Sequence, residues 1–340
     1  MKIKILYTAF LCFIALFSFA QQRPYYTQYI LNSFILNPAV AGIENYTDVK
    51  ISHRHQWIGL QDGPVTTYLT IHGPLKKQDY SRPSATGFNT DGENPRGRAY
   101  WQDYTRADPH AGVGFTMIND KTGPLNRFAA YATYAYHVGL TAKTSISAGI
   151  SGGVQNISLN TNKLTWDVPF DPAVAGNGYL NRISPDINAG VWLYSADYFV
   201  GASAQQIIPS KLKWADDTVR LAGGKLLPHM FFSGGYKFFL SEDITMLPSV
   251  LVKYINPTPV GIDLNTKVQY RDLLWAGGSY RMKDGFAAMI GINVSNTFNV
   301  GYSYDITTTR LNTVSRGTHE IQVGFLLGNR YGDWCPRNIW

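Results

Sequence analysis

Hydrophobic and polar residues alternate with a period of two along most of the chain after Gly42. In the stretch 298–305, for example, even-numbered positions carry Phe, Val and Tyr, whereas odd-numbered positions carry Asn, Gly, Ser and Asp. Successive side chains of a strand point to opposite faces of a sheet, so this alternation predicts strands with one apolar and one polar face. The fourteen predicted strands are residues 48–57, 65–74, 110–119, 127–139, 144–158, 186–195, 197–208, 229–240, 245–255, 260–271, 273–282, 285–295, 297–306 and 318–328.

The polar faces of these strands bear on the choice between two all-β architectures. They consist largely of Gly, Ser, Asn and Gln and carry few charges. In a soluble sandwich the polar face meets water, whereas in a membrane barrel the apolar face meets lipid and small polar residues line the interior. We therefore predict a transmembrane antiparallel β-barrel of about 14 strands, and regard a soluble secreted β-sandwich as the weaker alternative.

The composition agrees with a wall that faces lipid. Charged residues make up 16% of the chain, against about 25% in an average soluble protein. Aromatic residues reach 14%, and only four of the acidic residues are Glu. Because Tyr, Phe, Val and Thr fit pleated sheets and Glu favours helices, this balance excludes a helical bundle and a charged cytosolic enzyme.

The N-terminus predicts export. Lys2 and Lys4 precede an apolar stretch, 5–20, that ends in Phe-Ser-Phe-Ala, as in a signal peptide cut after Ala20. This stretch is shorter than the roughly 20 residues of a membrane-spanning helix. Cys335 is then the only cysteine of the mature chain, so an internal disulfide is excluded. Export also excludes nucleic acid as a partner.

The even number of predicted strands assigns each connection to one of the two ends of the barrel. An even number of strands places both barrel termini on the periplasmic side, where turns are short, and the longer loops outside. The long connections 159–185, 209–228 and 307–317 fall on the outer side, as expected. The longest one, 75–109, falls on the periplasmic side, where it is a docking loop, a luminal plug or a sign of missed strands.

The predicted organisation has four parts. A signal peptide, 1–20, is followed by a periplasmic or luminal segment, 21–47, then by the barrel, 48–328, and by a tail, 329–340. The segment before the first strand contains Asn-Pro and Ala-Gly turn signals. It either plugs the barrel, contacts periplasmic machinery or packs along the base of the barrel.

Charged residues on the polar faces of the late strands are the candidate luminal site. They either line an aqueous pore or form a packed polar interior, because buried charges usually pair. We expect Glu320 to face the lumen and to meet a basic residue such as Arg281 or Lys267. The candidate residues are Asp263, Lys267, Arg271, Arg281, Asp305 and Glu320.

The sequence supports no catalytic residue, cofactor site or metal site. Residues 149–153 match the G-x-S-x-G pattern of hydrolases, but they lie inside an alternating strand and not at a strand-to-helix turn. His53 and His55 share one face, yet no third ligand follows at a recognisable spacing. Arg54 and its neighbours are better interpreted as a strand end at an interfacial aromatic girdle.

Short motifs spread over residues 26–320 resemble one family. They include Tyr26-Thr27-Gln28-Tyr29, Asn32, Asn37-Pro38-Ala39, Ala41-Gly42, Arg54, Gln56-Trp57, Gly59, Gly63-Pro64, Asn119-Asp120, Gly123-Pro124, Tyr134, Tyr136-His137, Pro248-Ser249, Tyr280-Arg281, Gly301-Tyr302-Ser303-Tyr304-Asp305 and Gly317-Thr318-His319-Glu320. Together they resemble the PorP/SprF family of the type IX secretion system of the Bacteroidetes. The connection 75–109 is longer than this family usually has.

This resemblance implies a non-enzymatic protein of the outer membrane with no cofactor. It implies support for the export or surface anchoring of large adhesins with type B C-terminal sorting domains, in some members during gliding motility. The implied partners are such an adhesin, periplasmic components of the secretion system and outer-membrane lipid. A channel or transporter for small or hydrophobic solutes is the alternative, because it would share the same strand number.

Overall fold

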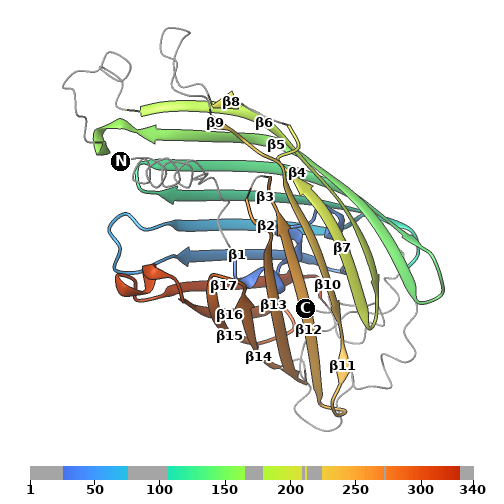
Figure 1. Cartoon of the computed structure of the whole chain (residues 1–340). Coiled ribbons are helices and arrows are strands. Elements are labelled where there is room, and N and C mark those ends of the chain that lie inside the picture. The colour runs from blue at the N-terminus through green and yellow to red at the C-terminus, as the bar shows by residue number, and fades with distance from the viewer. Residues whose placement is uncertain are drawn as a thin grey trace, which may run out of the picture.

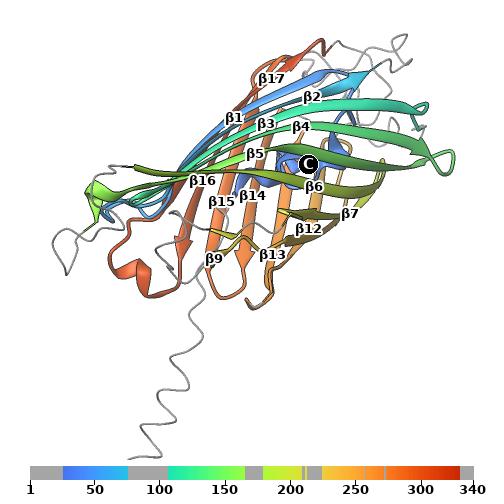
Figure 2. The ribbon, with the colours of Figure 1, turned by 90° about the horizontal axis from the view of Figure 1, so that it is seen from above.

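The computed structural model describes residues 26–75, 106–164, 179–208, 211–212, 224–256, 258–271 and 273–329. Its strands form a closed antiparallel barrel of 14 strands, which confirms the predicted fold class. The ring of strands is continuous, because β1 pairs with β17 and β10 pairs with both β7 and β12. Figures 1 and 2 show the first six strands and β12–β16 on opposite walls.

The strands agree with the sequence prediction to within a few residues, except at β6 and β7. The predicted strand 229–240 is divided into β10 and β11, and β8 and β9, which lie outside the predicted strands, pair only with each other within the described residues. The strands are β1 (Thr47–His55), β2 (Val65–Leu75), β3 (His110–Thr122), β4 (Leu125–Gly139), β5 (Thr144–Asn160), β6 (Tyr179–Ser195), β7 (Tyr198–Gln205), β8 (Lys211–Leu212), β9 (Gly224–Lys225), β10 (His229–Tyr236), β11 (Phe238–Phe239), β12 (Ile244–Tyr254), β13 (Gly261–Tyr270), β14 (Leu274–Arg281), β15 (Gly285–Asn293), β16 (Phe298–Thr307) and β17 (Thr318–Leu327).

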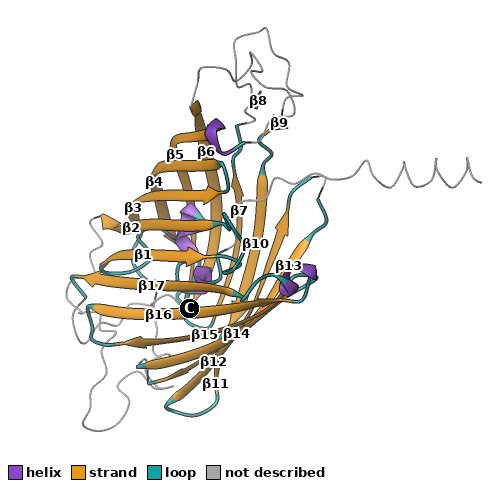
Figure 3. Cartoon of the chain, turned by 90° about the vertical axis from the view of Figure 1, so that its left-hand side faces the viewer, coloured by secondary structure: helices purple, strands orange, loops and turns teal. Residues whose placement is uncertain are grey.

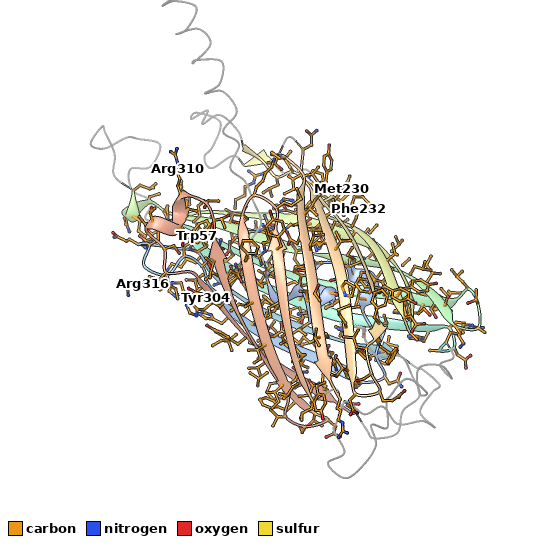
Figure 4. All side chains as sticks on the ribbon, turned by 60° about the horizontal axis from the view of Figure 1, so that its bottom comes forward. Trp57, Met230, Phe232, Tyr304, Arg310 and Arg316 are labelled. Carbon is orange, nitrogen blue, oxygen red and sulfur yellow. The ribbon has the colours of Figure 1, made fainter. Side chains whose placement is uncertain are left out.

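The two faces of the barrel wall differ as the alternation predicts. Apolar side chains point outward, as Phe286 and Ile290 do on β15, where more than half of each side chain is exposed. On β10, Met230 and Phe232 lie on the same outer surface (Figure 4). Polar side chains such as Ser303 and Gln322 are buried inside. This inside-out arrangement fits a lipid-facing wall and is wrong for a soluble sandwich.

Two connections meet at the predicted outer end, where β1 ends and β6 begins. The Ile58 amide donates to the Gly317 carbonyl at 2.9 Å, and the Arg316 amide donates to the Ile58 carbonyl at 2.7 Å. The Tyr304 hydroxyl donates to the Arg316 carbonyl at 3.0 Å (Figure 4). The two bonds of Ile58 tie the β1–β2 loop to the β16–β17 loop.

The wall is uneven in height. β5 and β6 have 17 residues each, whereas β7 and β10 have eight. β6 pairs with β5 along its whole length but with β7 only over residues 189–194. Figure 1 shows β4–β6 extending past the neighbouring β7.

Several sequence predictions fall outside the described residues. They concern the signal peptide, residues 76–105 of the long connection and the tail from residue 330. Within the described part, no helix is long and apolar enough to cross a membrane.

Candidate functional site: an N-terminal plug in the barrel lumen

Residues 26–46, called the plug below, lie inside the barrel, between its opposite walls (Figure 3). They form three short 3-10 helices, η1 (Gln28–Ile30), η2 (Ser33–Ile35) and η3 (Pro38–Val40). Apolar plug residues such as Ile30, Phe34 and Val40 pack with Trp192 and other inward-facing wall residues in one buried cluster. The water-excluded core of this protein is therefore the contact between plug and wall.

The turn into η3 is fixed by the sequence Asn37-Pro38-Ala39. The Asn37 Oδ1 accepts a bond from the Ala39 amide at 3.0 Å, and Pro38 has its φ preset for a first helical position. The Asn37 Nδ2 donates to the carbonyls of Val191, at 3.0 Å, and Ala202, at 3.2 Å. One side chain thus both starts η3 and attaches it to β6 and β7.

Five buried residues at the outer end of the plug form a charged cluster that we call the latch. The Arg54 Nη1 donates to the Thr27 Oγ1 at 2.7 Å and to the Glu320 Oε2 at 3.1 Å. The Arg54 Nη2 lies 2.7 Å from the Asp305 Oδ2, which also accepts from the Arg281 Nη1 at 3.0 Å. Two guanidinium groups thus balance two carboxylates.

Thr27 connects the plug to the latch with both its backbone and its side chain. Its amide donates to the Glu320 Oε2 at 2.8 Å, and its hydroxyl donates to the Asp305 Oδ2 at 2.6 Å. Hydrogen bonds to ionised groups are roughly twice as strong as neutral ones. The start of the plug at Thr27 is therefore held by hydrogen bonds to ionised groups, the strongest class of polar contact in the lumen.

A second polar group lies next to the latch. The Lys253 Nζ lies 2.7 Å from the Asp263 Oδ2, and the Arg281 Nε lies 3.8 Å from the same oxygen. The Asn265 Nδ2 donates to the Tyr29 hydroxyl at 2.6 Å. Burial raises the pKa of Tyr29 well above its usual value, so the phenol stays neutral inside the plug.

The base of the plug is held by three histidines at the opposite end of the barrel. The Gly42 amide donates to the His72 Nδ1 at 3.3 Å, and the His110 Nε2 lies 3.1 Å from the Gly42 carbonyl. The His137 Nε2 donates to the Ala41 carbonyl at 2.8 Å. The plug therefore runs from the latch to this base and is fixed at both ends.

Five of the six candidate luminal residues are buried inside the barrel. Arg281, Asp305 and Glu320 meet in the latch, and Asp263 lies beside it. Lys267, on β13, is also buried. Arg271 lies apart from them, in the turn after β13, where its Nε contacts the Asp243 Oδ1 at 2.8 Å.

The basic residue that pairs with Glu320 is Arg54, which differs from the sequence prediction. We expected Arg281 or Lys267, but Arg54 on the neighbouring strand β1 holds the carboxylate. The alternation of β1 already contained this signal, because Asp48, Lys50, Ser52 and Arg54 share its polar face. The assignment of Arg54 to an aromatic girdle was wrong, since its side chain is buried in the lumen.

Between the plug and the walls of β6, β7, β10 and β12 lies a small, partly open cavity. Its apolar lining includes Trp192, Phe199 and Phe231, and its polar lining includes Ser203 and Ser233. Because plug residues form one side of this cavity, Trp192 is placed to report movement of the plug.

The patterns weighed as enzymatic or metal sites lie elsewhere. Residues 149–153 are part of β5, where Ser151 exchanges a hydrogen bond with Thr133 at 2.7 Å. His53 and His55 face outward from β1. In the described ranges, no group of three or more His, Cys, Asp or Glu residues could hold a metal ion.

Comparisons with known proteins identify the family of this chain. The chain is similar in fold to the Acinetobacter baumannii outer membrane protein Omp33, with 8% identity, a TM-score of 0.46 and coverage of 84% of this chain and 100% of that one. The Ralstonia pickettii toluene transporter TbuX has 8% identity and a TM-score of 0.47, with coverage of 86% of this chain and 92% of that one. The CymD monoaromatic hydrocarbon channel has 11% identity and a TM-score of 0.46, with coverage of 90% of this chain and 94% of that one. No curated protein matches the chain. The model of the type IX secretion system membrane protein PorP/SprF family matches residues 18–325, and the chain belongs to this family.

Proposed function

We propose that this chain is a non-enzymatic outer-membrane component of the type IX secretion system that binds large adhesins with type B C-terminal domains. It supports their export or their anchoring at the cell surface, including, where the cell glides, adhesins used in motility. The observation that carries the proposal is the family match over residues 18–325, together with a barrel whose lumen is occupied. The family and the barrel also support a location in the outer membrane.

The plug supports a docking role over passage of solutes. It bonds to several separate parts of the wall, through Asn32 to Thr70 on β2, Asn37 to β6 and β7, and Thr27 to β16 and β17. An open channel needs a continuous aqueous path, and the plug places apolar side chains across it. The alternative of a solute channel therefore requires the plug to leave or rearrange.

The two ends of the barrel suit two classes of partner. The periplasmic components of the secretion system would meet the end where β2 and β17 finish, from which the long connection to β3 departs. The adhesin would meet the opposite, outer end through its C-terminal sorting domain. Neither interaction needs a cofactor.

The test is a detergent extract of native membranes containing the full chain with a tag after Trp340. We expect a large secreted protein with a C-terminal sorting domain to co-purify in stoichiometric amount. We also expect deletion of the gene to remove that protein from the cell surface and re-expression to restore it. A strain expressing an unrelated tagged outer-membrane barrel is the control for non-specific capture.

Two results together would overturn the proposal. They are normal display of all large adhesins in the deletion strain, and steady ion conduction by the purified full-length barrel in planar bilayers. That combination would favour the solute channel.

A further inference from the structure

A row of polar and aromatic side chains crosses the outside of the barrel wall near its predicted outer end. His319 on β17 pairs with His55 on β1 and with Tyr304 on β16. All three occupy the outward-facing positions of their strands, away from the plug-filled lumen. Beyond β1 the row continues through Val65 on β2 to Lys121 on β3.

Contacts among the side chains hold this row in place. The Tyr302 hydroxyl lies 2.6 Å from the His319 Nδ1, and the ring centres of Tyr304 and His319 lie 4.9 Å apart. A neutral His319 that accepts from the Tyr302 hydroxyl at Nδ1 carries its proton on Nε2. The row therefore presents an N–H donor on an imidazole ring whose orientation is fixed.

Arg316 lies beside this row, in the loop before β17. Its carbonyl accepts from the Tyr304 hydroxyl at 3.0 Å and its amide donates to the Ile58 carbonyl at 2.7 Å, so β16 and the β1–β2 loop both hold its backbone. The stem of its side chain passes Gly59, where an added Cβ would lie 3.8 Å from the Arg316 Cγ. Figure 4 shows Trp57, Tyr304 and Arg316 at the same end of the barrel.

The positive charge of Arg316 is not neutralised by the protein. The residue is exposed, and none of the ion pairs among the described residues involves it. The outward positions of β1, β2, β3, β16 and β17 include no carboxylate. This part of the outer surface therefore offers hydrogen-bond donors and positive charge to a ligand that brings negative charge.

Toward the periplasmic end, the outward positions of the same strands are apolar. On β17 the outward residues Phe325 and Ile321 are exposed, and His319 follows them nearer the outer end. On β1, Ile51 is exposed and precedes two outward histidines. The surface thus changes within a few residues from side chains that suit hydrocarbon to side chains that suit an anion.

This order matches the structure of an amphipathic lipid. Aromatic side chains mark the headgroup level of a membrane barrel, and the hydrocarbon zone begins below them. Arginine presents a planar fork of N–H donors that fits phosphate. A soluble anion would use only the polar row, whereas a lipid would use the polar row and the apolar side chains beneath it.

We propose that the surface formed by Arg316, His319 and His55, called the rim site below, binds the phosphate headgroup of a lipid in the outer leaflet. The acyl chains of this lipid lie along Ile321 and Phe325. Arg316 supplies the charge, and the two histidines supply further donors. The lipid is a ligand of the wall, so the rim site is independent of which secreted protein the barrel holds.

The rim site and the latch are opposite faces of the same strand segments. Each of the outward residues His55, Tyr304 and His319 is next in sequence to an inward-facing residue of the latch. The histidines of the rim site thus flank, on the outside, the strand ends that hold the plug on the inside. A lipid bound at the rim site therefore stabilises the part of the wall to which the start of the plug is attached.

The test measures lipid binding to the purified full-length barrel in a neutral detergent by native mass spectrometry. The probe is diphosphoryl lipid A, and the same lipid without its phosphates is the control ligand. We expect removal of the phosphates and Arg316→Gln each to weaken binding about tenfold, the effect of one hydrogen bond to a charged group. Arg316→Gln should not change binding of the lipid that lacks phosphate.

Lys283→Gln is the matched control variant. It removes an exposed cation from the turn between β14 and β15, at the same end of the barrel but outside the rim site. Because a solvated charge outside the site contributes only weak, screened attraction, binding should change less than about twofold. Heat-modifiable migration on gels checks that both variants fold.

A photo-crosslinking amino acid provides a second measurement, in native membranes and without a weakened variant. Placed at Ile321, it should crosslink to lipid A of the outer leaflet. Placed at Ile292, an outward residue of β15 at the opposite end of the barrel, it should crosslink to phospholipid and not to lipid A.

Four results would overturn the inference. Equal binding of diphosphoryl lipid A by Arg316→Gln and the wild type would remove the arginine from the site. Competition by inorganic phosphate at the same concentration as the lipid would identify a site for free anions. A protein crosslinked at Ile321 in place of lipid A would assign this surface to a partner chain. These three results leave the proposed function standing, whereas lipid A crosslinked only at Ile292 would reverse the orientation of the barrel.

Discussion

Arg54 is the residue whose replacement tests the latch most directly. Its side chain is buried and bonds to Thr27, Glu320 and Asp305 at 2.7–3.1 Å. Arg54→Met keeps much of the volume and removes the charge. The substitution leaves two carboxylates facing one guanidinium, that of Arg281. Removing one partner of a buried ion pair costs about 3–5 kcal/mol, and we expect a loss of stability of this size.

A second substitution separates the loss of charge balance from the loss of packing. Glu320→Gln in the Arg54→Met background restores one guanidinium to one carboxylate, and the carbonyl of the introduced side-chain amide can still accept from Thr27. The double variant should therefore be more stable than Arg54→Met alone. The coupling between the two sites should fall within the range of about 0.5–3 kcal/mol seen for residues in one network.

Urea unfolding of the refolded barrel in detergent measures both variants. Tryptophan fluorescence reports the transition, because Trp192 and Trp275 are buried in the cluster between plug and wall. Arg271→Met is the matched control, since this arginine pairs with Asp243 in a solvent-accessible turn where water screens the interaction. It should leave the urea midpoint unchanged.

Protease cleavage within residues 26–46, monitored at low urea, distinguishes release of the plug from unfolding of the wall. Arg54→Met should make the plug cleavable before the barrel loses its heat-modifiable migration. The electrostatic account of the latch fails if Arg54→Met stays within about 1 kcal/mol of the wild type and the Glu320→Gln effect is simply additive.

Three further predictions concern the contacts that hold the plug inside the barrel. Gly149→Ala should lower the free energy of unfolding by about 1–3 kcal/mol, because the new Cβ would lie 2.5 Å from the Ala39 nitrogen of the plug. Gly152→Ala on the same strand is the control: its Cβ meets nothing within 4 Å, so the urea midpoint should not change. Asn37→Ala should cost about 1–3 kcal/mol and increase cleavage of the plug, because two carbonyls and one amide lose their partner. Deletion of residues 27–41 should convert a closed barrel into one that conducts ions in planar bilayers, and unchanged conductance would show that the lumen is blocked by something other than the plug.

The wall could be predicted from the sequence because its information is local. Alternation and turn residues can each be recognised within segments of about ten residues, and counting these segments predicts the barrel and most strand ends. The plug could not be placed in this way. Its residues lack a period, and the contacts that fix it join Thr27 to Asp305 and Glu320, 278 and 293 positions away.

The two deviations at β6 and β7 have the same cause. The predicted strand at 186–195 is extended to Tyr179 by pairing with β5, and the predicted strand at 197–208 ends at Gln205 because β10 pairs with it only that far. Strand length here is decided by the neighbour and not by the strand's own residues. Within the described residues, β6 therefore extends past its pairing with β7, and this difference in length is not visible in the residues of either strand alone.

The plug limits where a partner can act on the barrel. A lumen filled from the latch at Arg54 to the base at Gly42 leaves the outside of the barrel as the surface on which a partner can act. Most of that outside is a band of apolar side chains, which any lipid or detergent tail can satisfy and which carries little directional information. With the plug in place, this barrel offers a partner its ends and its outer wall and keeps its interior closed.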